Sequence, residues 1–145
     1  SAQIALSYVR SHADSWDLPE DLFSKQEIHV HLPAGAVPKD GPSAGVALTT
    51  ALVSVLTGVP VRGDVAMAGE VTLRGRVLPV GGVREKVMAA HRVGMTTIIL
   101  PRRNERELAE LPVSIHDEVE FVLDDDVAEA LTASLVVAAS QRKAA

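Results

Sequence analysis

The sequence has no cysteine, few aromatic side chains and no apolar run long enough to cross a bilayer. Without cysteine there can be no disulfide framework and no thiolate nucleophile, and a reducing compartment is compatible with this composition. A membrane-spanning helix needs about 20 mostly apolar residues. The N-terminus also lacks the basic, apolar and small-residue order of a secretory signal. We therefore expect a cytoplasmic protein without a membrane partner.

Positive charge is scarce as well. The formal net charge is −5, and the basic residues are scattered rather than clustered. Nucleic-acid binding needs a concentrated basic surface, so we expect none here. A chain of 145 residues with 47% hydrophobic and 3% aromatic content can bury one mainly aliphatic core. The composition predicts one domain over residues 1–145.

Helical and strand patterns are mixed along the chain without regular alternation, which predicts an α+β fold with mixed short sheets and packed helices. We expect helices over residues 1–15, 43–57, 83–92 and 104–110 and after 124–126. Strands are expected over 26–32, 64–71, 96–100 and 119–123, with a hairpin over 72–78 turning near Gly75. Residues 14–25 resemble a loop with one helical turn, and 113–116 fit either a helix or a strand.

Two histidines, His29 and His31, lie two residues apart and would share one face of the expected strand over 26–32. A metal site needs a third or fourth ligand, and no cluster of His, Cys or Asp at ligand spacing lies nearby. We therefore predict no metal site.

Residues 41–45 read Gly-Pro-Ser-Ala-Gly and fit the G-x-S-x-G pattern of a nucleophile elbow. An elbow needs a buried strand leading into the serine, whereas a polar loop precedes Ser43. The esterase alternative would also need Asp64 with His91 or His116 to complete a triad.

Two other interpretations of the same segment do not require a nucleophile. Glycines before a helix can bind phosphate, but the Walker pattern needs Lys and Ser or Thr at the helix start, and Pro42 lacks an N–H. ATP is not expected to bind there. In the simplest interpretation, Ser43 is the N-cap of the following helix.

Lys86 gives Ser43 a possible partner. In the helix expected over 83–92, the stripe of positions 83, 86, 87 and 90 is apolar except for Lys86. Burial disfavours the ammonium form, and a neutral amine is a competent general base for a serine hydroxyl. Periodicity does not separate this from a lysine whose amine reaches water. A Ser-Lys dyad, with the N–H groups of the helix after Ser43 as an oxyanion site, is the active-site hypothesis.

Three blocks of sequence resemble the proteolytic domain of Lon, the ATP-dependent serine protease. They are PKDGPSAG at 38–45, GDVAMAGEVTLRG at 63–75 and VLPVGGVREK at 77–86. The resemblance implies a fold like domain 2 of ribosomal protein S5, with Ser43 as nucleophile and Lys86 as general base. It also implies that the chain is an N-terminally truncated fragment of a longer protein.

The resemblance implies partners and cofactors for the longer protein. It implies a hexameric ring that degrades unfolded or damaged proteins. ATP and Mg²⁺ would bind to an ATPase module that is absent from this chain, and no cofactor is expected in this domain. The alternative is a catalytically silent module that serves ring assembly or binding.

Further residues follow from the resemblance. In some inactive Lon forms, an acid at the position of Asp40 pairs with the lysine. In many Lon proteins a threonine that helps hold the lysine stands where this chain has Ala68, so this support is either missing here or supplied by Thr72 or a backbone carbonyl. Because edge strands bind extended peptides by β-addition, we expect the substrate to pair with the segment Met67, Ala68, Gly69 and Glu70.

Overall fold

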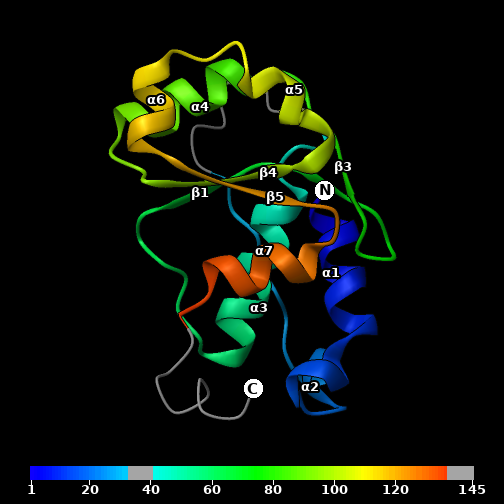
Figure 1. The fold of residues 1–145 in the computed structure, drawn as a ribbon. Coiled ribbons are helices and arrows are strands. Elements are labelled where there is room, and N and C mark those ends of the chain that lie inside the picture. The colour runs from blue at the N-terminus through cyan, green and yellow to red at the C-terminus, as the bar shows by residue number, and fades with distance from the viewer. Residues whose placement is uncertain (33–40, 137–145) are drawn as a thin grey trace.

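The computed structural model describes residues 1–32 and 41–136, and its centre is a sheet of three parallel strands (Figure 1). The strands are β1 (Val65–Met67), β4 (Thr97–Pro101) and β5 (Glu120–Asp124), in the order β1-β4-β5. Every residue of β4 is buried. This is expected of a short aliphatic strand that has a neighbour on each side and helices on both faces.

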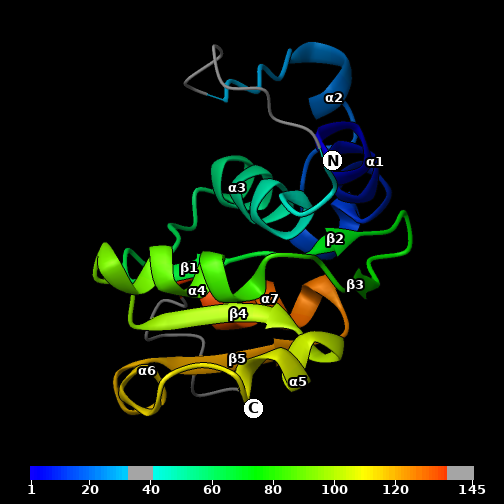
Figure 2. The ribbon, with the colours of Figure 1, turned by 90° about the horizontal axis from the view of Figure 1, so that it is seen from above.

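Helices cover both faces of this sheet (Figures 1 and 2). On one face lie α4 (Val83–Arg92), α5 (Glu105–Leu108) and α6 (Val113–Glu118), and on the other lie α1 (Ala2–Ser11), α3 (Gly45–Thr57) and α7 (Val127–Ser134). Side chains of β4 alternate between the two layers: Ile98 and Leu100 join the cluster under α4, whereas Ile99 joins the cluster with α1 and α3. The α+β class is confirmed.

Shorter elements complete the fold. They are η1 (Ala13–Trp16), α2 (Leu22–Lys25), β2 (Glu70–Val71), β3 (Val77–Leu78) and η2 (Arg102–Asn104). The predicted hairpin is confirmed, because β2 and β3 pair antiparallel around Gly75. Gly75 has a φ of 83°, and a Cβ there would lie 2.6 Å from the Tyr8 ring. Both facts require glycine at the turn.

The strand predicted over residues 26–32 is wrong. The segment is not a strand, and none of the described strands lies beside it to complete a ladder. Val30 and Leu32 are 40% and 51% exposed. An alternating pattern alone therefore misled the prediction, because a strand also needs a hydrogen-bonding neighbour.

Two further boundaries differ from the prediction. The strand expected over 64–71 is two strands, interrupted at Ala68 and Gly69, because β1 pairs with β4 whereas β2 turns to pair with β3. The helix expected from Ser43 begins at Gly45, with Ala44 at the N-cap position. Ser43 is therefore not a helix cap.

One buried acid is expected to make stability depend on pH. Asp124 is 0% exposed, and neither carboxylate oxygen has a hydrogen-bond partner within the described ranges. Burial, helped by the charges of Glu129 and Asp125, raises the pKa of Asp124 to about 7. The folded chain then binds a proton that the unfolded chain releases near pH 4, so stability falls as pH rises from about 4 to 7.

We predict that Asp124→Asn removes most of this loss, which the pKa change limits to about 4 kcal/mol. Denaturant unfolding of the 145-residue chain at pH 4.5 and pH 7.5 measures it, with the exposed Asp117→Asn as control. If wild type and Asp124→Asn lose the same free energy of unfolding over this interval, the explanation is wrong.

Candidate active site

Ser43 lies in the turn that leads into α3, and backbone hydrogen bonds fix this turn against the segment between β1 and β2. The N–H of Gly45 donates to the carbonyl of Pro42 at 3.1 Å. The N–H of Gly69 donates to the carbonyl of Ser43 at 3.0 Å, and the N–H of Val46 donates to the carbonyl of Gly69 at 3.1 Å. The serine is therefore placed by its backbone.

Two glycines allow this close approach. A Cβ at Gly45 would lie 2.7 Å from the backbone nitrogen of Val71, and a Cβ at Gly69 would lie 2.6 Å from a methyl of Val46. Neither position has room for a side chain. The second glycine of the G-x-S-x-G pattern is thus explained by packing, without a nucleophile elbow.

Lys86 belongs to the first turns of α4 and is partly buried. Its amine donates to the carbonyl of Gly81, in the loop that precedes the same helix. Lys86 and Ser43 both line one cavity of about 390 Å³. No hydrogen bond joins their side chains in the part of the chain that the structure describes.

The rest of this cavity is almost entirely apolar. Its other lining residues are Ala44, Ala47, Ala66, Met67, Ala68, Ala89, Ala90, Ile98 and Leu100. Two residues that carry a hydroxyl and an amine therefore line one largely apolar cavity. Such a pair is suited to proton transfer from the hydroxyl to the amine.

The residues expected to bind substrate lie next to this cavity. Met67 and Ala68 line it, Gly69 is bonded to Ser43, and Glu70 pairs with Leu78 in the β2–β3 hairpin. Strand β1 is at the edge of its three-stranded sheet within the described ranges. Their role in substrate binding stays a prediction.

The support of Lys86 can now be assigned. Thr72 is occupied in the hairpin turn, where its hydroxyl accepts from the N–H of Arg76 at 3.1 Å. A backbone carbonyl, that of Gly81, is the acceptor for the amine. A backbone carbonyl was predicted only in general terms, because the sole sequence signal for this contact is the pair of glycines before α4. The hypothesised pairing of Lys86 with Asp40 lies outside the described residues.

Two of the N–H groups at the start of α3 narrow the oxyanion hypothesis. The N–H groups of Gly45 and Val46, the first two of α3, donate to protein carbonyls. They are engaged in holding the serine turn, so they are not available to a substrate oxygen. An oxyanion site at this helix start must use other donors, such as the N–H of Ala47, a residue that also lines the cavity.

The esterase triad is not assembled. His91 contacts Glu118 at 2.6 Å, and His116 bonds to the carbonyl of Leu108 at 2.9 Å. Asp64 is bonded to Arg62, whose guanidinium holds the pKa of this carboxyl below its usual value. None of the three lines the cavity that holds Ser43.

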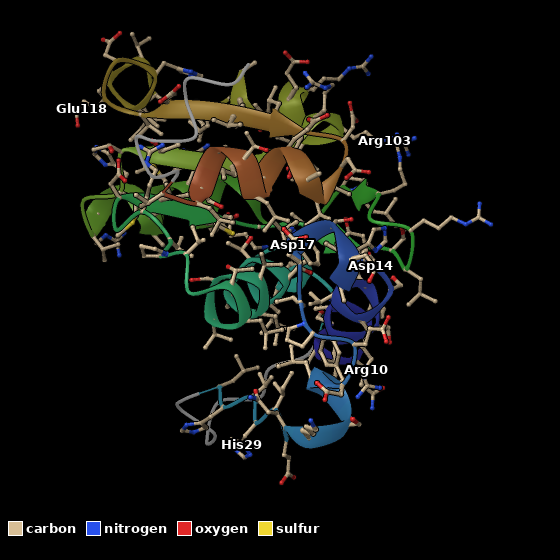
Figure 3. The ribbon with its side chains drawn as sticks, turned by 90° about the horizontal axis from the view of Figure 1, so that it is seen from below. Arg10, Asp14, Asp17, His29, Arg103 and Glu118 are labelled. Atoms are coloured by element: carbon tan, nitrogen blue, oxygen red, sulfur yellow. The ribbon has the colours of Figure 1, made fainter. Side chains whose placement is uncertain are left out.

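His29 and His31 are exposed, and Figure 3 shows His29 far from Glu118. Across residues 1–32 and 41–136, no group of three or more His, Asp or Glu side chains could hold a metal ion. None of the helices in these ranges is long and apolar enough to cross a membrane.

Comparison with known proteins gives one consistent family. Residues 1–137 match the family described as Lon protease (S16) C-terminal proteolytic domain. The chain is 58% identical over 135 residues to a Lon protease of Anaeromyxobacter dehalogenans, covering 93% of this chain and 16% of that protein. It is 57% identical over 129 residues to Lon protease 2 of Bdellovibrio bacteriovorus, covering 89% and 16%. It is 53% identical over 136 residues to a Lon protease of Brevibacillus choshinensis, covering 91% of this chain and 18% of that protein. The chain spans about a sixth of the length of these relatives.

Proposed function

The chain belongs to the family of Lon C-terminal proteolytic domains, and from this premise we propose that it is a serine endopeptidase domain in which Ser43 is the nucleophile and Lys86 the general base. The observation that supports this most directly is the shared cavity, which is lined by Ser43 and Lys86 and otherwise by apolar residues.

In the proposed reaction the neutral amine of Lys86 accepts the hydroxyl proton of Ser43 as its oxygen attacks the peptide carbonyl carbon. The tetrahedral intermediate collapses, the C–N bond breaks, and Lys86 returns the proton to the leaving amine. A water molecule, deprotonated by the same lysine, then attacks the acyl carbonyl carbon. The ester C–O bond breaks, and Lys86 returns the proton to the oxygen of Ser43. The substrate would lie as an extended chain along the segment Met67, Ala68, Gly69 and Glu70.

For the whole protein we propose a cytoplasmic, ATP-dependent protease that assembles as a hexamer and degrades unfolded or damaged proteins. Support comes from the family and from the relatives' name, Lon protease. ATP and Mg²⁺ would act on an ATPase module in the rest of the protein, and the proposed chemistry at Ser43 uses no cofactor.

A second candidate is a catalytically silent module for ring assembly or binding. Two observations favour it: the amine of Lys86 bonds to Gly81 rather than to Ser43 within the described residues, and the methyl of Ala68 contributes no hydroxyl to the cavity.

A serine-reactive phosphonate probe separates the two candidates in the full-length protein. We expect labelling at Ser43, located by mass spectrometry of the digested protein, because only an activated hydroxyl reacts readily. Ser54→Ala is a matched control, since Ser54 lies in α3 but does not line the cavity. It should label like wild type, and absence of labelling in wild type would support the silent module.

A further inference from the structure

Asn104, the only asparagine of the chain, is 2% exposed and stands at the N-cap position of α5. Its side chain makes no capping bond to that helix. Instead it bonds to both backbone groups of Val80: Oδ1 accepts from the N–H at 3.0 Å, and Nδ2 donates to the carbonyl at 2.9 Å. One buried amide thus holds a single peptide segment as a neighbouring strand would.

Glu107 fixes the orientation of this amide. Nδ2 of Asn104 also donates to Oε1 of Glu107 at 2.6 Å. A carboxylate oxygen can only accept, so the NH₂ group must face Glu107 and the oxygen must face the N–H of Val80. Glu107 itself is exposed.

The segment that Asn104 holds leads directly to the lysine. Gly81 follows Val80, and its carbonyl accepts the hydrogen bond from the amine of Lys86. Gly81 and Gly82 are exposed, and Gly82 has a φ of 67°, so this loop gains no rigidity from side chains of its own. Its position relative to the cavity therefore depends on the fixed peptide of Val80.

We propose that Asn104, oriented by Glu107, is a positioning residue that sets the place of the Lys86 amine through the Val80–Gly81 peptide. The inference rests on the proposed role of Lys86 as general base. A neutral amine that donates one hydrogen to Gly81 would keep its lone pair for a second partner, and Ser43 lines the same cavity as Lys86. Small displacements of such a group are costly to the rate.

The test is peptide cleavage by the full-length protein, with kcat and KM measured separately. We expect Asn104→Ala to lower kcat by about 10- to 100-fold and to leave KM within about twofold, since the amine and not the substrate is displaced. Hydrogen exchange of the Val80 amide should accelerate in the same variant, because its acceptor is gone.

Variants at Glu107 test the proposal without changing a buried residue. Glu107→Ala should lower kcat several-fold, whereas Glu107→Gln, which keeps an acceptor oxygen, should restore it. Glu105→Ala is the matched control, an exposed acid of the same short helix outside this network, and it should behave like wild type.

The possible failures are distinguishable. If Glu107→Ala and a folded Asn104→Ala keep the wild-type kcat while Lys86→Met loses cleavage, Asn104 is not a positioning residue and the proposed function stands. If Lys86→Met still cleaves peptides, the proposed function itself is wrong. Should Asn104→Ala not fold, the Glu107 variants decide.

Discussion

Replacing Ser43 with alanine in the full-length protein is expected to abolish peptide cleavage, with a loss of about 10⁴-fold or more in kcat, as is typical when an enzyme loses its nucleophile. The physical reason is that no acyl-enzyme can form without the hydroxyl oxygen. Cleavage of a fluorogenic peptide measures the effect. The control Ser54→Ala, further along α3, should keep wild-type activity.

The fold should survive this change. The bond that ties the Ser43 residue to Gly69 uses its backbone carbonyl, which alanine retains. Circular dichroism and thermal unfolding of Ser43→Ala should therefore match wild type. Wild-type cleavage by a pure Ser43→Ala preparation would show that another residue is the nucleophile.

Sequence reasoning predicted the elements whose signal is local. Helix α4 has the predicted bounds, strand β4 lies within one residue of the predicted strand, and the hairpin turns at Gly75. In each case a single segment carries its own pattern: an apolar stripe between glycines, an aliphatic run, or a glycine between two strand patterns.

Predictions that depended on distant residues were weaker. Nothing within residues 26–32 shows whether another strand will lie beside them, and the strand predicted there does not form. The start of α3 moved from Ser43 to Gly45 because the backbone of Ser43 bonds across to Gly69. These boundaries are set by tertiary hydrogen bonds, which leave no local pattern.

In the candidate site, too, only the residues with a local sequence signal were predicted. Ser43 and Lys86 were found from a motif and a helical stripe, and the structure brings both to one cavity. The carbonyl of Gly81 carries no side-chain signal, and the sequence placed Asn104 only at the start of the helix expected over 104–110. A residue that acts through another residue's backbone is visible only in the folded chain.

Variants of Lys86 can test separately its role as a base and its role in holding the Gly81 loop. Lys86→Met keeps the length and apolar character of the stem but removes the amine. We expect kcat to fall by about 10⁴-fold, because the hydroxyl loses its proton acceptor. Arg84→Met is the control, since Arg84 is exposed on the same helix and does not line the cavity.

Lys86→Arg makes the distinction sharper. A guanidinium can still donate a hydrogen bond to the carbonyl of Gly81, yet it remains protonated at any working pH and cannot act as a base. If proton transfer is the role of Lys86, the arginine variant should be as inactive as Lys86→Met. If instead the lysine serves only to hold the Gly81 loop, Lys86→Arg should retain cleavage, and the proposed dyad would be wrong. Peptide cleavage by the two variants, in full-length protein of equal thermal stability, decides between these roles.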